Sequence, residues 1–151
     1  PIWLQEGENY TGENDIGDTY IEVDLTNQKV YGYIDGSKVV ETDCVSGSVA
    51  ARHTTPGGLY QIKYKASPAV LRGDLLPDGS YSYESHVVYW MPFNGGIGLH
   101  DADGWRSKYG GDIYLRGGSH GCVNLPRKDA KSIYEKFDVG TPVVCYYCDN
   151  D

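Results

Sequence analysis

Apolar and polar residues alternate regularly near the start of the chain. Every second position is apolar in residues 20–25, as expected of a strand with one buried face. Similar segments cover residues 29–34 and 38–45, and Asp35-Gly36 between them is a turn sequence typical of β-hairpins. The pattern therefore predicts three consecutive antiparallel strands.

Further strands are predicted at residues 59–64 and 141–147. The first follows a turn, Thr55-Pro56-Gly57-Gly58. Residues 70–90 contain Pro77-Asp78-Gly79, a second hairpin tip. This segment predicts either a protruding hairpin that could cover a site or an ordinary meander.

One helix is indicated near the C-terminus, where apolar residues recur at three- and four-residue spacing: Ala130, Ile133, Tyr134 and Phe137. We expect Asn124 to cap this helix, Pro126 to lie in its first turn and Gly140 to end it. It would begin just after Cys122, where its positive end could favour a thiolate. The prediction is a mainly β domain, a mixed sheet arranged as a sandwich or barrel, with one helix after Cys122.

Composition limits the domain organisation and the partners. Residues 1–18 are polar, glycine-rich and aperiodic, so we expect a linker or the remnant of a preceding domain, followed by one domain over residues 19–151. Any export signal or membrane anchor is expected outside this sequence, and the domain itself is expected to be a monomer. With 13 Lys and Arg against 21 Asp and Glu, the net charge of −8 argues against a nucleic-acid partner. The 14 tyrosines suit a half-buried sheet and a groove for an extended polar ligand.

The four cysteines predict different roles. Cys44 and Cys145 lie in predicted strands and are expected to fill the core, whereas Cys148 is expected to be free; whether any of the three pair stays open. Cys145 and Cys148 have metal-knuckle spacing, but no second cysteine pair or nearby histidine completes four ligands, so no metal is expected.

Cys122 stands in the most informative segment, residues 119–124 (Ser-His-Gly-Cys-Val-Asn), with His100 a short loop upstream. An unperturbed thiol has a pKa of about 8.5, and a nearby imidazole can convert it into a thiolate beside an imidazolium. Gly121 allows a substrate to approach the backbone closely, so that amides can face a developing oxyanion. The segment predicts cysteine acyl transfer.

These residues resemble the signature of the L,D-transpeptidase catalytic domain, the YkuD family. The resemblance extends to residues 20–28, the turn at 55–58 and residues 140–144, and so covers about 19 to 147; Gly57 stands where the family often has threonine. The segment 96–102 is most similar to enzymes of Gram-positive bacteria.

The resemblance implies roles for matching positions. Cys122 would be the nucleophile and His100 its acid and base. The amides of Gly121 and Cys122, with that of His120 as a further candidate, would form the oxyanion hole. Ser119 or the backbone near Asp101 would orient an imidazole. His120 is also a second candidate proton acceptor.

Other residues carry weaker expectations. The candidate substrate-binding residues are Asn124, Tyr83, Trp90 and Arg116. A helix cap explains Asn124 equally well, whereas packing is the preferred interpretation of Trp90 and a solvated surface that of Arg116. Lone histidines are commonly structural, so we expect structural or surface roles for two more: His53 and His86.

The resemblance implies a peptidoglycan L,D-transpeptidase outside the cytoplasmic membrane, in the bacterial cell wall. It would transfer an acyl group from a tetrapeptide stem, with release of D-alanine, to the side-chain amine of a second stem, and carbapenems would acylate it. No cofactor is required. Three alternatives stay open: an L,D-carboxypeptidase on the same fold, a sortase-like transpeptidase with Arg127 as its third residue, and a non-catalytic peptidoglycan-binding module.

Overall fold

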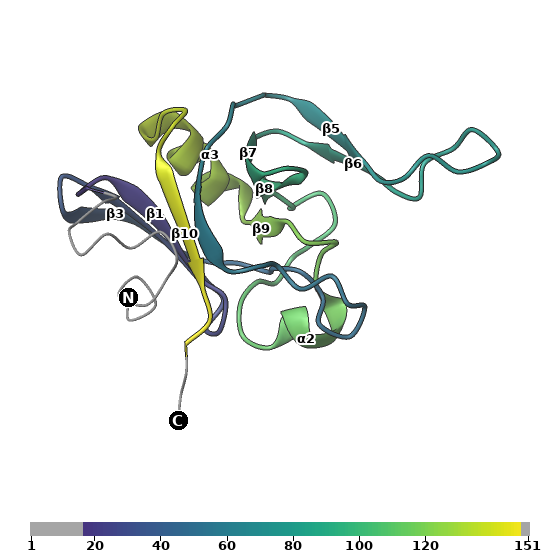
Figure 1. Cartoon of the computed structure of the whole chain (residues 1–151), viewed down its shortest axis with the longest axis horizontal. Helices are drawn as coiled ribbons and strands as arrows, with labels where there is room; N and C mark the ends of the chain where they lie inside the picture. Colours follow the sequence, from purple (N-terminus) through teal and green to yellow (C-terminus); the bar gives the residue numbers. More distant parts are fainter. Residues whose placement is uncertain (1–16, 149–151) are drawn as a thin grey trace.

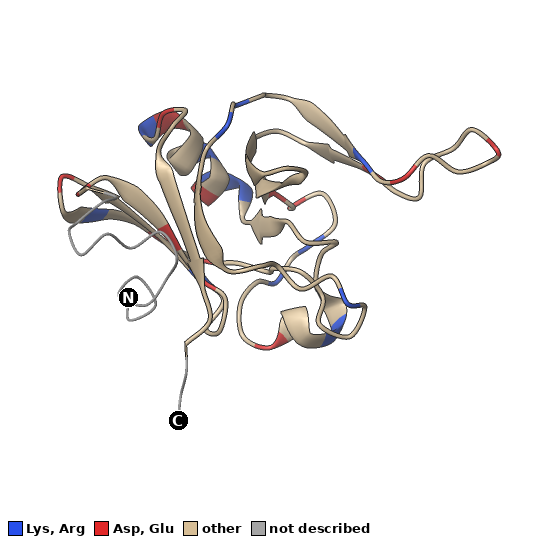
Figure 2. Cartoon of the chain, in the orientation of Figure 1, with Lys and Arg blue, Asp and Glu red and all other residues tan. Residues whose placement is uncertain are grey.

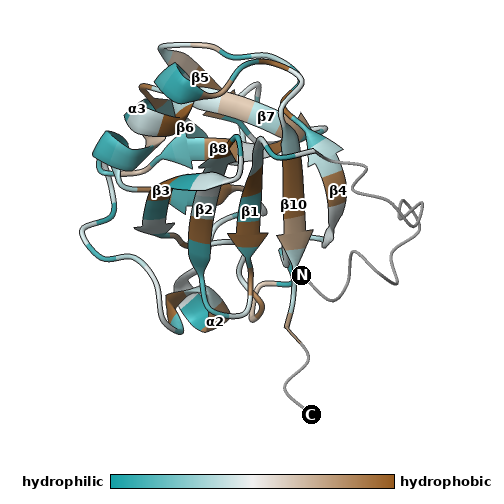
Figure 3. Cartoon of the chain, turned by 90° about the vertical axis from the view of Figure 1, so that its left-hand side faces the viewer, coloured by the Kyte–Doolittle hydropathy of each residue, from teal (hydrophilic) through white to brown (hydrophobic). Residues whose placement is uncertain are grey.

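The computed structural model describes residues 17–148 and is built around a five-stranded sheet. Its strands, in spatial order, are β3 (Ser37–Asp43), β2 (Lys29–Ile34), β1 (Tyr20–Asp24), β10 (Pro142–Tyr146) and β4 (Gly58–Gln61). Figure 3 shows this order across one face of the molecule. Strands β1, β2 and β3 are antiparallel neighbours, as predicted, whereas β10 lies parallel to β1. The last strand of the described chain, β10, therefore lies beside the first, β1.

The turn between β2 and β3 forms where the sequence predicts it. Asp35 and Gly36 both have positive φ angles, of 51° and 83°. Two such residues in succession match the right-handed twist of the flanking strands, and Asp and Gly tolerate that conformation well.

A three-stranded sheet lies against the first and contains His100 and Asn124. It consists of β7 (Trp90–Asn94), β8 (Ile97–Asp101) and β9 (Val123–Leu125), with β8 antiparallel to β7 and parallel to β9. The parallel pairing places residue 100 beside residue 124. Residues about 24 positions apart in the sequence, in β8 and β9, are therefore direct neighbours in this sheet.

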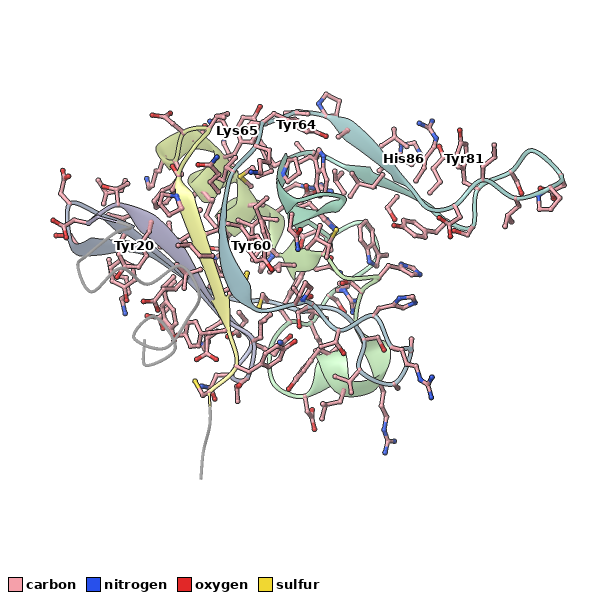
Figure 4. All side chains as sticks on the ribbon, in the orientation of Figure 1. Tyr20, Tyr60, Tyr64, Lys65, Tyr81 and His86 are labelled. Atoms are coloured by element: carbon pink, nitrogen blue, oxygen red, sulfur yellow. The ribbon has the colours of Figure 1, made fainter. Side chains whose placement is uncertain are left out.

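The β5–β6 hairpin comprises β5 (Ala69–Arg72), β6 (Glu84–Val87) and the loop between them. It extends well away from the body, which confirms the predicted protruding hairpin (Figure 1). Tyr81 and His86 lie along it (Figure 4), and acidic residues mark its far end (Figure 2).

Two helices complete the described chain. The predicted helix is present as α3 (Arg127–Lys136), but the expected cap is wrong: Pro126 precedes it and Asn124 lies in β9. The backbone of Asn124 instead exchanges hydrogen bonds with Val45, at 2.8 and 3.0 Å. A strand, not a helix start, therefore follows Cys122. The short α2 (Ile113–Gly117) was not predicted; it has no buried residues and no side-chain cap, so it left no periodic signal.

The core fills the space between the two sheets and α3. It includes Ile21, Val23, Phe93, Leu99 and Ile133, with Cys44 and Cys145 fully buried among them, as predicted. Cys148 is exposed and unpaired, and none of the four cysteines forms a disulfide. Within residues 17–148, no helix has the length and apolar character needed to cross a membrane.

Candidate active site

A cavity of about 790 Å³ lies between the β5–β6 hairpin and the edge formed by β8 and β9. Most of the predicted site residues line it: His100, Cys122, Ser119, His120, Asn124, Tyr83 and Trp90. The fold thus brings His100 and the cysteine segment to one open space, although they come from different strands of the sheet.

His100 occupies a fixed position in β8. Its side chain is almost completely buried, and its ring lies between those of Trp90 and Trp105, with both centroids 5.9 Å away. Its Nδ1 lies 2.7 Å from the backbone oxygen of Asp101. Because a carbonyl oxygen only accepts, Nδ1 carries the proton and Nε2 is the basic nitrogen. Of the two orienting groups expected from sequence, the structure places the backbone of Asp101 at the imidazole.

Cys122 lies immediately before β9, with Sγ 3.4 Å from the Gly96 oxygen. Burial raises the pKa of this thiol to about 11, although a backbone hydrogen bond from Gly98 lowers it in part. Burial lowers the pKa of the His100 imidazole. Both shifts favour a neutral thiol and a neutral imidazole in the free protein, not the ion pair expected from the sequence.

Ser119 holds the loop in front of Cys122. Its Oγ donates to the Cys122 carbonyl at 2.5 Å and accepts from the Gly121 amide at 3.1 Å. Gly121 itself has a φ of +130°, a conformation that side chains disfavour. Its amide is therefore engaged within the loop, which leaves the Cys122 amide as the stronger candidate for binding an oxyanion.

Thr55, from the turn that resembles the family motif, supports the same loop from behind. Its buried hydroxyl donates to the Gly121 carbonyl at 2.5 Å and accepts from the Gly47 amide at 2.9 Å. This contact gives the turn a physical role, because it ties the loop to the segment after β3.

His120 points toward the β5–β6 hairpin. Its ring stacks on Tyr83, with centroids 4.2 Å apart and planes within 10°, and the His53 ring is 5.1 Å away. A second cavity, of about 500 Å³, adjoins the first at this stacked pair, since Tyr83 and His120 line both cavities. His53 also lines the second cavity. His53 is thus a neighbour of the loop, not an isolated surface residue.

Asn124 and Arg106 form a polar pair at the floor of the cavity. Only one orientation of the buried Asn124 amide satisfies its neighbours: Nδ2 donates to His100 Nε2 at 3.1 Å, and Oδ1 accepts from Arg106 Nε at 2.7 Å. Sequence reasoning missed Arg106 and gave Trp105 only a packing role. No local motif marks either residue, because both reach the site through a loop after β8.

Asp101 anchors the hairpin to the site. Its buried carboxylate accepts from the amides of Val88 and Tyr89, both at 2.8 Å, and from Arg127 Nε at 2.9 Å. One residue therefore orients the His100 ring through its backbone and fixes the return of the hairpin through its side chain.

Two of the candidate substrate-binding residues, Trp90 and Arg116, have little or no access to the cavity. Trp90 lines the cavity but is 6% exposed and donates to Tyr64 Oη, so packing accounts for most of its surface. Arg116 lies exposed on α2, away from the cavity lining, so the structure does not bring it to the site. Among residues 17–148, no cluster of three His, Cys, Asp or Glu side chains could hold a metal ion.

The chain matches the YkuD family, described as the L,D-transpeptidase catalytic domain, over residues 18–145. The chain therefore belongs to this family. No curated protein sequence matches it significantly.

Solved structures agree with this assignment. The chain is similar to a cysteine-to-serine mutant of L,D-transpeptidase from Enterococcus faecium, with 43% identity, a TM-score of 0.78, and coverage of 87% of this chain and 50% of that one. It is also similar to the E. faecium catalytic domain acylated by ertapenem, with 44% identity, a TM-score of 0.74, and coverage of 86% and 98%. A Mycobacterium smegmatis L,D-transpeptidase shares the fold at 22% identity and a TM-score of 0.71, with coverage of 85% and 58%. The chain spans about half the length of the E. faecium protein it matches.

Proposed function

We propose that this domain is a peptidoglycan L,D-transpeptidase in which Cys122 is the nucleophile and His100 its acid and base. The observation that carries the proposal is that both side chains line one cavity, with Nδ1 of His100 bound by the Asp101 carbonyl and Nε2 left as the base. The family match and the similarity to an enzyme acylated by ertapenem support it.

The reaction proceeds in two steps. Cys122 Sγ attacks the carbonyl carbon of the third residue of a tetrapeptide stem, and Nε2 of His100 takes the thiol proton. The bond to the terminal D-alanine breaks as its nitrogen receives that proton, which leaves a thioester on Cys122. The side-chain amine of a second stem then attacks the thioester and gives a proton to Nε2 of His100. The C–S bond breaks as a 3→3 cross-link forms, and the departing sulfur takes that proton, which restores the thiol.

The same proposal covers location and organisation. Residues 19–151 would act as a monomeric catalytic domain outside the cytoplasmic membrane. The domain would work on the cell wall of a Gram-positive bacterium. Residues 1–18 would be a linker or a remnant of a preceding domain, and all but the last two lie outside the described residues.

Product analysis tests the proposal. The full chain is incubated with a disaccharide-tetrapeptide, and products are separated by mass spectrometry. We expect free D-alanine and a dimer linked through two third residues, both absent with Cys122→Ala. A tripeptide without dimer would assign the L,D-carboxypeptidase instead, and binding without release of D-alanine would assign a binding module. The family match leaves the sortase-like alternative unsupported, and Arg127 is bound to Asp101 in any case.

A further inference from the structure

The buried imidazole of His100 meets a different polar group at each nitrogen. Nδ1 donates to the Asp101 carbonyl at 2.7 Å, and Nε2 accepts from the Asn124 amide at 3.1 Å. A neutral ring protonated at Nδ1 satisfies both contacts. An imidazolium does not, because its Nε2–H would face the N–H of Asn124.

Arg106 decides which way the Asn124 amide points. Its Nε and Nη2 lie 2.7 and 3.3 Å from the amide oxygen. The opposite orientation would set amide N–H against guanidinium N–H, and a guanidinium has no acceptor to offer. Nη1 of Arg106 also donates to the Gly117 carbonyl at 2.9 Å, so the guanidinium is itself held in place by the end of α2.

We propose that Arg106 is a positioning residue, which acts through Asn124 to keep His100 in the neutral tautomer that carries its proton on Nδ1. This inference rests on the proposed function, in which Nε2 is the base. In the resting enzyme the Asn124 amide shields the lone pair of Nε2, and it gives way when the thiol proton arrives. The protonated ring then lacks an acceptor at Asn124, which favours passing the proton to the leaving amine.

The charges around the ring are few. Asp101 is next to it in β8, Arg106 comes from the following loop, and Arg127 of α3 reaches only the Asp101 carboxylate. The flanking rings of Trp90 and Trp105 are uncharged. Burial and Arg106 lower the pKa of His100, while Asp101 raises it. Loss of the Arg106 charge, and loss of the fixed orientation of the Asn124 amide, should therefore each make protonation of His100 easier.

The test compares the full chain with Arg106→Gln by ¹⁵N NMR of the His100 ring across pH 5–9. We expect Nδ1–H with an unprotonated Nε2 in the unaltered chain down to below pH 6.5, the ordinary value for histidine. In Arg106→Gln we expect the proton to stay on Nδ1, facing the Asp101 carbonyl, and Nε2 to become protonated at higher pH than in the unaltered chain. The rate of ertapenem acylation in Arg106→Gln, relative to the unaltered chain, should fall progressively as the pH is lowered and should differ by less than about twofold at pH 8.5, where both rings are neutral.

Two further variants make the result decisive. Asn124→Asp keeps the contact with Arg106 but offers His100 an acceptor, so the ring should become protonated at higher pH in a folded protein. Arg72→Gln removes an arginine that lines the same cavity and pairs with Glu84, and it should leave the His100 titration unchanged.

The inference is overturned if His100 titrates identically in Arg106→Gln, if Arg72→Gln shifts it equally, or if acylation falls by the same factor at every pH. The NMR readout needs no turnover, so it stands apart from the proposed function. A lack of acylation in the unaltered chain would instead refute that function.

Discussion

The rings of Tyr83 and His120 stack with centroids 4.2 Å apart, which joins the β5–β6 hairpin to the loop that carries Cys122. The contact also separates two cavities, since both rings line each of them. A hairpin that projects from the body (Figure 1) is thereby tied to the site at Tyr83, the residue just before β6. Water exclusion from a thioester would depend on this contact.

Replacement of Tyr83 by alanine should therefore favour hydrolysis over transfer. An aromatic pair of this kind contributes about 1 kcal/mol, so we expect the ratio of cross-linked dimer to tripeptide to fall about fivefold. Tyr83→Phe keeps the ring and should retain the ratio. Equal product ratios in the alanine variant and the unaltered chain would show that the stack does not control water.

Ser119→Ala tests the loop that holds Cys122. The change removes one hydrogen bond to the Gly121 amide and one to the Cys122 carbonyl. At about 1 kcal/mol each, their loss should slow acylation by ertapenem about tenfold or more, measured by stopped-flow absorbance. Ser46→Ala removes a buried serine outside the cavity lining and serves as the control. Unchanged acylation in Ser119→Ala would mean that the loop is held by other contacts.

The thiol pKa of about 11 predicts how alkylation depends on pH. In a Cys148→Ser background, which removes the exposed thiol, the rate of Cys122 alkylation by iodoacetamide should rise about tenfold per unit from pH 7 to 10, because only the thiolate reacts. The folded pKa lies above that of an unperturbed thiol, which is about 8.5 to 9, so the free energy of unfolding should also fall as pH rises above about 9. A rate that levels off below pH 8 would instead indicate a preformed ion pair with His100.

Asp101→Asn should loosen the return of the hairpin. The substitution weakens the contacts with the Val88 and Tyr89 amides and the pair with Arg127, and loss of hydrogen bonds to a buried charge costs about 3 kcal/mol. Urea unfolding measures this cost. Arg127→Gln is the matched control: its side chain is 44% exposed, so we expect a loss below about 1 kcal/mol. Similar losses in both variants would locate the stabilisation in the ion pair rather than in the two amides.

The features that could be predicted from the sequence are those set by residues close together in the chain. The turn at Asp35 and Gly36 follows from local chemistry, and the strands around it follow from strict alternation. The predicted helix cap at Asn124 was wrong because an Asn two residues before a Pro also fits a helix start. Asn124 lies in a strand instead, because it pairs with β8 and Val45, both distant in sequence.

Long-range contacts explain the other differences at the site. Arg106 reaches Asn124 only because β8 and β9 lie side by side, so spacing along the chain carries no sign of it. Arg116 was a candidate substrate-binding residue by its type, but the short α2 leaves it exposed away from the cavity. The segment 119–124 could be recognised from the sequence because its residues are contiguous and His100 stands at the family's spacing from it.

The most direct test of the account is to locate the covalent adduct. The full chain is incubated with ertapenem, its intact mass is measured, and the modified peptide is sequenced by tandem mass spectrometry, with Cys122→Ala in parallel. The account predicts one adduct per chain, on Cys122, and none in the variant. An adduct on another residue, or an unmodified Cys122 in a folded chain, would contradict it.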